Sequence, residues 1–238
     1  MKKLISNIPN HIAIIMDGNS RWAKKLNKLP IFGHKAGIKS MLEIIFFSIK
    51  SNLKSLTLFA FSSENWNRSP QELSELINLF TKKIYEKSKI LNKYNVKIHI
   101  IGNILMFNKK FQKNIKLSEK LTYNNTGLIL NIAINYGGRW DIIEGIKKFY
   151  KKIIDKNIKL KNINENIFNK YICLNKQKPI DLLIRTGGEL RISNFLLWQI
   201  AYSEFFFTDI LWPDFKNFHF KKAIYDFSKR KRRFGKSS

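Results

Sequence analysis

Six short apolar runs, rich in β-branched and aromatic residues, recur along this chain, and helical patterns separate most of them. Alternation of this kind is typical of βα units, whose strands pair in parallel within one sheet. A chain of 238 residues that is 44% hydrophobic can bury one sizeable core. We therefore predict one α/β domain over residues 1–238, with a mostly parallel six-stranded sheet flanked by helices. The predicted strands are residues 12–16, 56–61, 96–101, 128–134, 181–184 and 204–207.

Two of the intervening helices have clear sequence signals. Ser69, Pro70 and Glu72 fit the N-cap, the first helical position and the reciprocal partner of a capping box, so a helix should begin there. The apolar face of this helix is expected at Leu73, Leu76, Ile77, Phe80 and Ile84. An earlier helix is expected over residues 34–50, with its apolar face at Ile38, Met41, Leu42, Ile45 and Ile49.

Five segments combine an apolar run with a charged or hydroxyl-bearing cluster, and we expect these clusters to meet at the carboxyl ends of the parallel strands. The segments are HIAIIMDGNSRW, FAFSSENWNRSPQE, INYGGRWD, DLLIRTGGELRIS and AYSEFFF. They carry two isolated acids, Asp17 and Glu204, together with several arginines. Arginine clamps phosphate bidentately, and a carboxylate pair can hold Mg²⁺ bridged to a phosphate. The pattern therefore indicates a diphosphate substrate.

Each cluster also has a purely structural interpretation. Residues 17–22 fit either a phosphate site at a helix N-terminus or an ordinary turn, and residues 62–68 fit either a substrate loop or a loop that satisfies its own backbone. Backbone N–H groups of the Gly-Gly turn after Arg185 can cradle phosphate oxygens, although solvated arginines around a flexible loop remain an alternative. His34 is more typical of a helix cap or a packed residue than of a catalyst. Glu204 precedes three phenylalanines and needs a partner or a metal, because an unpaired buried charge is costly.

The net charge of +27 has three explanations: compositional drift, attraction to anionic substrates or lipids, and nucleic-acid binding. Because the cations are scattered over helices and form no arginine-rich stripe, nucleic-acid binding is the least favoured. The single cysteine, Cys173, excludes an internal disulfide and a cysteine-based zinc cluster, and it suits a reducing cytosol. The first apolar stretch runs directly into Asp17, and no apolar run is long enough to span a bilayer. We therefore expect a soluble, cytoplasmic protein without a cleavable signal peptide.

Several common motifs are absent from the sequence. It contains no Gly-x-x-x-x-Gly-Lys phosphate loop, no Gly-x-Gly-x-x-Gly dinucleotide motif and no Gly-x-Ser-x-Gly nucleophile elbow. It also lacks the Asp-Asp-x-x-Asp motif of helical trans-prenyltransferases. These absences argue against the common kinases, dehydrogenases and hydrolases.

The chain resembles the cis-prenyltransferase family, in particular its bacterial members that make undecaprenyl diphosphate. The resemblance covers nearly the whole chain and includes HIAIIMDGNSRWAKK, FGHKAG, LFAFSSENWNRSPQE, NIAINYGGRWDI, DLLIRTGGELRISNFLLWQIAYSEFFFTDILWPDF and RRFG, in that order. It implies sequential, Mg²⁺-dependent condensation of isopentenyl diphosphate onto farnesyl diphosphate, with a cis double bond formed at each addition. The expected product is a polyprenyl diphosphate, the lipid carrier precursor of peptidoglycan in the bacterial cell wall. A growing hydrocarbon would need an apolar tunnel between the sheet and the helices.

The resemblance also implies roles for individual residues. Asp17 matches the catalytic aspartate that holds the Mg²⁺–diphosphate, Asn65 matches an asparagine assigned a part in proton removal, and Glu204 matches a second metal ligand. Residues matching the allylic diphosphate pocket are Gly18, Asn19, Ser20, Arg21, Trp22 and His34. Residues matching the loop near the reacting carbons are Ser62, Ser63, Glu64, Trp66 and Arg68. Residues matching the clamp on isopentenyl diphosphate are Arg185, Arg191, Ile192 and Ser193.

The resemblance further implies a homodimer, in which the basic tail of residues 229–238 reaches the partner subunit, and a peripheral contact with the membrane for product release. Three positions depart from the family pattern: Ser20 replaces glycine, Pro30 replaces an arginine for which Lys28 can compensate, and Leu190 replaces a histidine found in some members. Two other hypotheses remain to be separated by experiment. One is a non-catalytic binding subunit, which the presence of Asp17 and Arg21 argues against. The other is a nucleic-acid-binding protein, which would explain the charge and leave the motifs unexplained.

Overall fold

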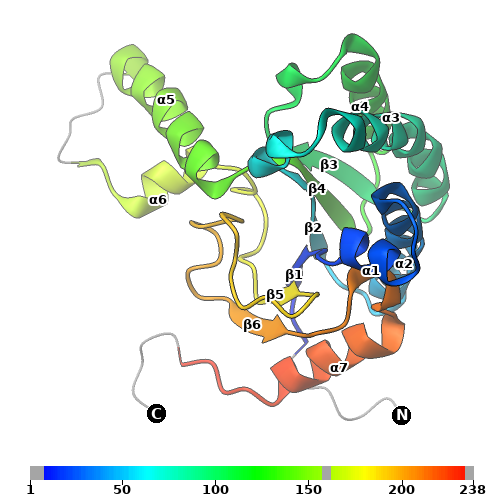
Figure 1. Ribbon diagram of the computed structural model, residues 1–238. Helices are drawn as coiled ribbons and strands as arrows, with labels where there is room; N and C mark the ends of the chain where they lie inside the picture. Colours follow the sequence, from blue (N-terminus) through cyan, green and yellow to red (C-terminus); the bar gives the residue numbers. More distant parts are fainter. Residues whose placement is uncertain (1–7, 157–161, 234–238) are drawn as a thin grey trace.

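The computed structural model describes residues 8–156 and 162–233, and it contains one six-stranded sheet in the order β3-β4-β2-β1-β5-β6 (Figure 1). Every neighbouring pair in the sheet is parallel. The strands are β1 (His11–Ile15), β2 (Ser55–Ser62), β3 (Lys97–Ile101), β4 (Ile129–Tyr136), β5 (Leu182–Arg185) and β6 (Glu204–Phe207). The predicted α/β class and all six predicted strands are confirmed, because short β-branched runs between helices have few other ways to be buried.

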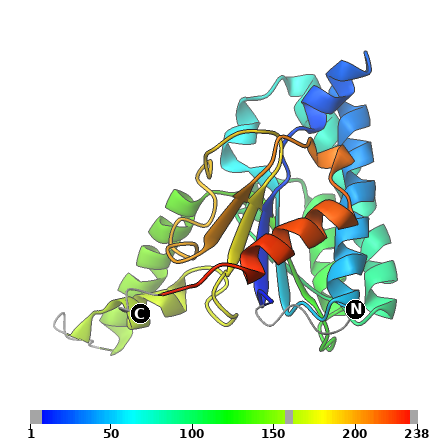
Figure 2. The same ribbon diagram turned by 90° about the horizontal axis from the view of Figure 1, so that it is seen from below.

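The helices lie on both sides of the sheet and at its edges (Figures 1 and 2). The α-helices are α1 (Asn19–Lys25), α2 (Pro30–Lys50), α3 (Pro70–Lys93), α4 (Lys109–Leu121), α5 (Gly138–Lys156), α6 (Glu165–Phe168) and α7 (Asn217–Ser228). Short 3-10 turns are η1 (Ser63–Asn67), η2 (Ile104–Met106), η4 (Asn169–Tyr171) and η5 (Trp212–Asp214). Among the helices of residues 8–156 and 162–233, none is long and apolar enough to cross a membrane.

The sheet buries apolar side chains on both faces. On one face, residues such as Ile12, Leu56 and Ile184 pack against α2 and α7 in the largest buried cluster. On the other face, Ala13 and Leu183 pack against the irregular segment that follows α6. Burial on both faces explains why these strands read as continuous apolar runs instead of alternating ones.

Both helices with clear sequence signals form, with differences in detail. The helix predicted over residues 34–50 begins four residues earlier, because Pro30 is well suited to the first helical turn. Its fully buried positions are mainly Gly33, Gly37, Ser40, Ile44, Ile45 and Ser48, so the predicted apolar face is only partly correct. At the start of α3 the Ser69 hydroxyl accepts from the Glu72 N–H at 3.4 Å, as predicted. The Glu72 carboxylate pairs with Arg68 at 2.5 Å. In a capping box it would instead accept from the backbone N–H of Ser69.

The sheet directions decide which sequence clusters can meet. β1, β2 and β5 deliver their following residues to one edge of the sheet, which is where Asp17, Ser62 and Arg185 lie. Glu204 is the first residue of β6 and aligns with Leu182, the first residue of β5. The expectation that Glu204 joins the carboxyl-end cluster is therefore wrong within one chain. Glu204 instead pairs with Arg230, whose Nη1 lies 2.8 Å from its Oε2.

Candidate functional site

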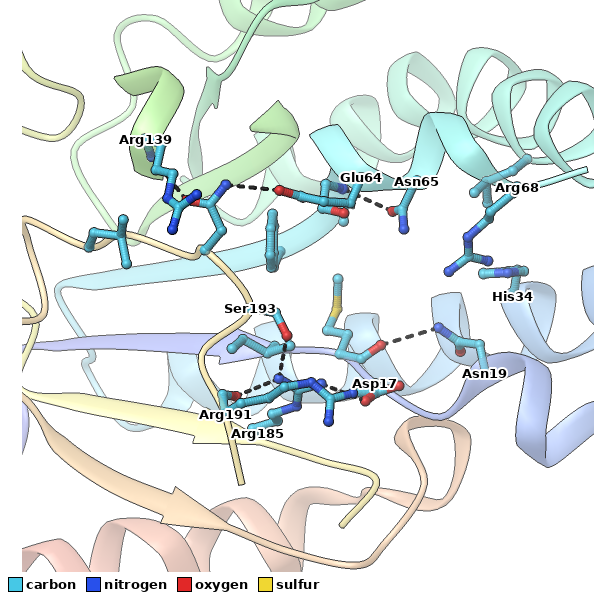
Figure 3. Close-up of a pocket in the computed structure, with 18 residues that line it drawn as sticks. Asp17, Asn19, His34, Glu64, Asn65, Arg68, Arg139, Arg185, Arg191 and Ser193 are labelled. Carbon is cyan, nitrogen blue, oxygen red and sulfur yellow. Dashed lines mark hydrogen bonds and ion pairs between the residues drawn. The ribbon is translucent and has the colours of Figure 1, made fainter. Parts of the chain in front are cut away.

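A cavity of about 750 Å³ opens at the carboxyl edge of the sheet, above β1, β2 and β5 (Figure 3). It collects residues from three of the predicted groups into one site. The predicted residues that line it are Asp17, Asn19, His34, Ser62, Glu64, Asn65, Arg68, Arg185, Arg191 and Ser193. Four arginines and few acids surround it, so the cavity is electrostatically suited to a highly charged anion.

Asp17 is fixed by the backbone around it. Its carbonyl accepts from the Thr186 hydroxyl at 2.7 Å and from the Trp212 N–H at 3.0 Å. Gly18 follows with a φ of +112°, and a Cβ there would lie 2.8 Å from Leu211. Glycine is therefore required by the left-handed backbone and by packing against Leu211.

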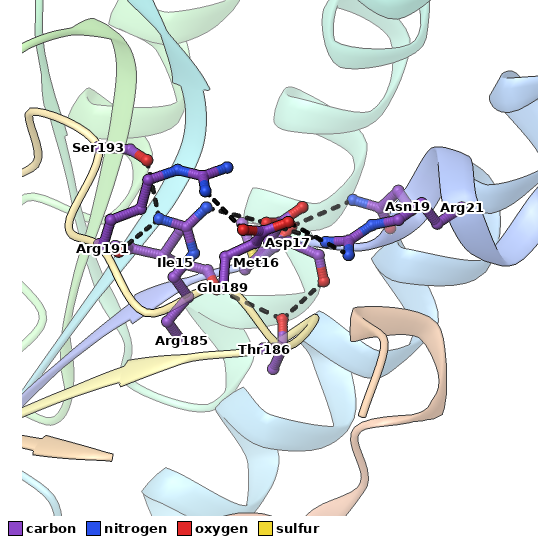
Figure 4. A network of polar contacts seen from close by, with 10 residues as sticks. All are labelled: Ile15, Met16, Asp17, Asn19, Arg21, Arg185, Thr186, Glu189, Arg191 and Ser193. Atoms are coloured by element: carbon purple, nitrogen blue, oxygen red, sulfur yellow. Dashed lines mark hydrogen bonds and ion pairs between the residues drawn. The ribbon is translucent and has the colours of Figure 1, made fainter. Parts of the chain in front are cut away.

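Two arginines hold the Asp17 carboxylate from opposite sides (Figure 4). Arg185 Nη2 lies 2.9 Å from Oδ2, and Arg21 Nη2 lies 3.1 Å from the same oxygen. Because both contacts are to Oδ2, Oδ1 is the carboxylate oxygen available to a cation. Asp17 is 29% exposed, so a ligand in the cavity can reach it.

The guanidinium of Arg185 organises the loop that follows β5. It is only 4% exposed, and its Nη1 donates to the Ser193 hydroxyl at 2.7 Å and to the Arg191 carbonyl. Its Nε is buried and has no hydrogen-bond partner among the residues that the structure describes. A planar guanidinium can make these contacts simultaneously, whereas a lysine ammonium cannot reproduce their fork. Arg185 therefore couples the position of Asp17 to the position of Arg191 and Ser193.

Glu189 lies between two of the predicted substrate-binding arginines. Its Oε2 is 2.5 Å from Arg191 Nη1, and its Oε1 is 3.7 Å from Arg21 Nη1 (Figure 4). Glu189 and both arginines are substantially exposed, so these ion pairs are weak and exchangeable. The carboxylate occupies the place at which an anionic ligand would meet both cations.

The Gly-Gly turn does not cradle an anion in the way the sequence suggested. The Gly187 N–H donates to the Ile210 carbonyl and the Gly188 N–H donates to the Thr208 carbonyl, both at 2.9 Å. Their φ angles are +87° and +81°, which is the backbone region that favours glycine. A Cβ on Gly187 would come within 2.6 Å of Arg21 Nη2, so this turn leaves space for the arginine.

The opposite wall of the cavity is the 3-10 turn η1. The Asn65 Oδ1 accepts from the Ser62 N–H at 2.9 Å, which directs the amide into the cavity (Figure 3). Glu64 Oε1 accepts from Asn194 Nδ2 at 2.9 Å. Burial raises the pKa of Glu64, but hydrogen bonds from Asn194, Ser63 and Ser62 outweigh it, and the pKa is lowered overall. Glu64 is therefore an ionised, oriented carboxylate.

His34 faces the cavity from α2, close to the pair formed by Arg68 and Glu72. Its Nε2 lies 3.8 Å from Glu72 Oε1, beyond hydrogen-bonding distance. Burial, followed by the charge of Arg68, lowers the pKa of His34 to about 4. The ring is therefore neutral at neutral pH, and it can supply a hydrogen bond but no charge to an anion.

Two polar residues of the cavity wall, Arg139 and Asn194, were not predicted from the sequence. Arg139 lies in the first turn of α5, where the helix dipole disfavours a cation. Its backbone N–H donates to Asn194 Oδ1 at 3.0 Å. The sequence analysis included the motif INYGGRWD but did not single out Arg139. An arginine at a helix start is unfavourable, and this placement is the signal that could have identified it. Asn194 could not be found in this way, because its partners Glu64 and Arg139 are distant in the sequence.

Several predicted site residues contact parts of the protein outside the main cavity. Trp22 Nε1 donates to Asp214 at 2.8 Å, and Trp66 Nε1 donates to Asn135 at 2.8 Å while its ring packs against Phe61. Ile192 packs in the core cluster behind the loop. Predicted residues that do not line the main cavity are Gly18, Ser20, Arg21, Trp22, Ser63, Trp66, Ile192 and Glu204. Of these, Arg21 still contacts Asp17, and Ser63 and Trp66 flank the η1 wall.

The floor of the cavity is apolar and extends between β2, α2 and α3. A second cavity of about 50 Å³ shares Met16, Phe59 and Leu76 with the first. Its other apolar lining residues are Ile38, Met41, Leu79, Phe80 and Trp212. A hydrocarbon attached to a diphosphate in the main cavity would therefore meet an apolar path that starts in the predicted direction. A continuous tunnel along that path stays a prediction.

In the described part of the chain, no group of three or more acidic, histidine or cysteine side chains is arranged to hold a metal ion. Asp17 alone therefore cannot form a complete protein-ligated magnesium site. Mg²⁺ commonly binds through one or two carboxylates and the oxygens of a substrate phosphate. One carboxylate beside a cation-lined cavity fits this mode of binding.

Comparison with known proteins agrees with this geometry. Residues 15–235 match the family described as "Putative undecaprenyl diphosphate synthase". A ditrans,polycis-undecaprenyl-diphosphate synthase of Wigglesworthia glossinidia brevipalpis, specific for (2E,6E)-farnesyl diphosphate, is 59% identical over 97% of this chain and 88% of its own. The Escherichia coli K12 enzyme of the same name is 51% identical over 98% and 92%. Lavandulyl diphosphate synthase from Lavandula x intermedia, solved with dimethylallyl diphosphate, superposes with a TM-score of 0.92 at 34% identity, over 96% and 99%.

The similarity to the curated relatives extends over nearly the full length of both chains and includes the segments that form the cavity. The chain therefore belongs to the undecaprenyl diphosphate synthase family, and the protein is a transferase of the cis-prenyltransferase type.

Proposed function

We propose that the protein elongates farnesyl diphosphate by successive condensation with isopentenyl diphosphate and releases a long-chain polyprenyl diphosphate, undecaprenyl diphosphate, the carrier precursor for peptidoglycan synthesis. The observation that carries this proposal is the single cavity in which Asp17 and four arginines surround an apolar floor. Cations and a metal-binding carboxylate suit two diphosphates, and the floor suits the hydrocarbon attached to one of them. The specificity for farnesyl diphosphate in the names of the relatives supports the choice of primer.

The two diphosphates have different places in this proposal. Arg185, Arg191 and Ser193 form one connected group after β5, which we assign to isopentenyl diphosphate. Arg21, Asn19 and His34 come from α1 and α2, and we assign them to the allylic diphosphate. Asp17 contacts both arginine groups, so it stands where the two substrates adjoin. Holding two substrates side by side contributes to catalysis by orienting them before reaction.

The reaction needs charge stabilisation at the leaving group. The bond between C1 and oxygen of the allylic diphosphate breaks, and C4 of isopentenyl diphosphate forms the new carbon–carbon bond at C1. A proton then passes from C2 of the former isopentenyl unit to an oxygen of the released diphosphate, and the electron pair of the broken C–H bond forms the new double bond. Guanidinium groups that are already fixed, as Arg185 is, stabilise the departing diphosphate without reorganising during the reaction.

Mg²⁺ is proposed as the cofactor, which Asp17 would hold together with the diphosphate of the substrate. When bound, it neutralises negative charge on the leaving diphosphate. Glu204 lies at the opposite end of its strand, so it cannot share this ion with Asp17 of the same chain. A metal-binding role for Glu204 requires a second ion or a second subunit, and release from Arg230.

Asn65 remains in the proposal with a more limited role. Its Oδ1 already accepts from the Ser62 N–H, and a carboxamide is a very weak base. The group that it presents to the cavity is the amide N–H₂. We therefore propose that Asn65 orients the reacting diphosphate or prenyl unit by donating a hydrogen bond, and does not itself accept the proton.

A homodimer is proposed from the surface of α5, which extends away from the sheet in Figure 1. Ile143, Ile146, Tyr150 and Ile154 recur at helical spacing and are all exposed. Such an apolar stripe on a soluble protein marks an interface, and sedimentation of an Ile146→Glu, Ile154→Glu variant as a monomer would support the assignment.

The basic tail is proposed to reach the partner through residues 234–238, which lie outside the described residues. The preceding Arg230 and Arg232 bind their own chain at Glu204 and Asp181.

The proposal is tested by incubating the purified protein with farnesyl diphosphate, radiolabelled isopentenyl diphosphate and Mg²⁺. We expect label to enter a lipid that extracts into organic solvent, and far less label to enter it in the same time with the Asp17→Ala variant. A binding subunit without activity would leave the label in water. Salt-sensitive binding of nucleic acid without any turnover would favour the nucleic-acid alternative instead.

We place the enzyme in the cytoplasm, with a peripheral contact at the membrane.

A further inference from the structure

The connection between α1 and α2 forms an exposed tip at the carboxyl edge of the sheet, which Figure 2 shows beyond the ends of the strands. All residues from 24 to 29 are exposed, and they read Lys-Lys-Leu-Asn-Lys-Leu. Phe32 and Lys35, on the first turns of α2, are exposed beside them. We call this set, residues 24–29 with Phe32 and Lys35, the α1–α2 tip.

The α1–α2 tip exposes three large apolar side chains at once. Leu26 is 47% exposed, Leu29 is 60% exposed and Phe32 is 46% exposed. The tip consists of the end of α1, the connection and the start of α2. Because both helices turn their other faces toward the core, these three side chains cannot be buried against the domain. Isolated exposed leucines are ordinary on protein surfaces, but an apolar cluster on one projecting element marks a contact site.

The same element is strongly cationic. Lys24, Lys25, Lys28 and Lys35 belong to the tip, and the sequence contains no Asp or Glu from residue 22 to residue 42. In the described part of the chain none of these four lysines forms an ion pair, and the lysines that do are Lys83, Lys87, Lys147 and Lys152, all outside the tip. Lys28 Nζ and Lys35 Nζ lie 5.9 and 5.3 Å from the centre of the Phe32 ring, so charge and apolar surface are interleaved.

A hollow of about 570 Å³ lies at the base of the tip. Its cationic lining comes from Arg21, Lys24 and Lys28, and its apolar lining comes from Leu29 and Pro30. A phosphate headgroup at the lysines and the start of an acyl chain at Leu29 would match this arrangement. A soluble diphosphate would use the cations and leave the exposed leucines without a partner.

We propose that the α1–α2 tip is the surface by which the protein docks on anionic membranes, with Leu26, Leu29 and Phe32 inserted at the boundary of the acyl chains and the lysines at lipid phosphates. Basic residues around a small apolar cluster are the combination that binds bilayer interfaces. This inference rests on the peripheral membrane contact in the proposed function and assigns it to a surface. It also explains why this tip, in a chain of net charge +27, carries no balancing acid.

Docking through this tip has a consequence for the catalytic cavity. Arg21 lies on α1, lines the hollow and also contacts Asp17 at 3.1 Å. The bilayer would therefore lie beside the mouth of the cavity, and a product too apolar for water could pass into lipid over a short distance. Anionic vesicles should accordingly accelerate repeated turnover by relieving product release.

The proposal is tested by co-sedimentation with phosphatidylcholine vesicles that contain or lack phosphatidylglycerol. The variant Leu26→Ser, Leu29→Ser, Phe32→Ser should bind anionic vesicles at least tenfold more weakly than the wild type. The variant Lys24→Glu, Lys25→Glu should lose roughly fivefold or more per lysine, and its residual binding should depend less on salt. The matched control is Leu121→Ser, Tyr123→Ser at the C-terminal end of α4 and in the turn that follows it, where apolar side chains are also exposed next to lysines.

Loss of binding in the tip variants with wild-type binding in the control supports the proposal. Equal losses in the tip and control variants, or vesicle binding that does not change in the tip variants, would overturn it. Because vesicle binding is measured without substrates, its result does not depend on whether the proposed reaction is correct. Turnover of each variant in detergent, without vesicles, shows that the fold and the catalytic cavity are intact.

A second measurement reports insertion directly. A Leu29→Cys protein is labelled with an environment-sensitive fluorophore, and Leu121→Cys serves as the control. Burial raises the pKa of the native Cys173 thiol, so the label will react preferentially at the introduced cysteine. A blue-shifted, brighter emission with anionic vesicles at position 29 but not at position 121 is expected. Binding without such a shift at position 29 would refute insertion of the tip, and a shift induced by a soluble protein fraction alone would favour a protein partner.

Discussion

Replacing Arg191 by alanine separates the two diphosphate sites. In the structure the Arg191 side chain is 61% exposed and pairs with Glu189 at 2.5 Å, while its carbonyl accepts from Arg185. The carbonyl contact survives the substitution, so the loop should keep its shape. An exposed ion pair contributes about 0–1 kcal/mol to stability, so the midpoint of thermal unfolding should fall by no more than about 2–4 °C.

The effect on substrate binding should be much larger than the effect on stability. Removing one charge-assisted hydrogen-bonding group from a diphosphate costs about 1.5–3 kcal/mol, which is roughly 10- to 150-fold in affinity. Arg191→Ala should therefore raise the KM for isopentenyl diphosphate by that factor and leave the KM for farnesyl diphosphate nearly unchanged. Arg21→Ala should show the opposite preference, because Arg21 lies on α1 beside the proposed allylic site.

Steady-state kinetics with each substrate varied at saturation of the other measures both constants. Arg191→Lys is the matched control, since it keeps the charge and loses the planar fork, and its KM for isopentenyl diphosphate should lie between those of the wild type and Arg191→Ala. If both alanine variants weakened the two substrates equally, the separation of the sites would be refuted even though the family assignment would stand.

Three further predictions follow from the same cavity. Asp17→Ala should lower turnover by on the order of 10²–10³ while circular dichroism shows an unchanged fold, and activity within a few-fold of the wild type would contradict the role of Asp17. Arg139→Ala should raise the KM for one of the substrates. The thermal unfolding midpoint should stay the same or rise, because the substitution removes a cation from the start of α5. A lower midpoint with unchanged kinetics would show that the residue has a structural role. The pKa of His34 is lowered to about 4, so the unfolded chain binds a proton there at higher pH than the folded protein does. The free energy of unfolding, relative to that of the His34→Gln variant, should therefore fall as the pH decreases from about 6.5 to 4. If the thermal unfolding midpoints of the two proteins changed in parallel over this range, burial would not shift the pKa of this histidine.

The sequence was most informative about the strands and about the catalytic edge of the sheet. Apolar runs that are buried on both faces leave little choice of structure, and a parallel sheet brings the residues after its strands to one edge. The sequence alone therefore places Asp17 and Arg185 together. Glu204 was misplaced for a reason visible in AYSEFFF, where the acid precedes the apolar run and so begins the strand.

Other features depend on partners that are distant in sequence. The Gly187–Gly188 turn could not be distinguished from an anion cradle, because its N–H groups are satisfied by carbonyls from the segment after β6. Trp22 and Trp66 lie inside the right motifs, but no local pattern shows that their indole rings turn toward Asp214 and Asn135. The depth of the apolar path, and with it the product length, likewise depends on packing between α2, α3 and the sheet.

We propose that this cavity joins isopentenyl units in the cis configuration onto farnesyl diphosphate. The most direct test of this proposal is the structure of the product itself, determined by mass spectrometry for chain length and by carbon NMR for double-bond geometry after a reaction with Mg²⁺. We expect a long polyprenyl diphosphate in which the farnesyl double bonds stay trans and every added unit is cis. A product with trans additions, or no condensation by a folded protein supplied with both substrates and Mg²⁺, would contradict the proposal.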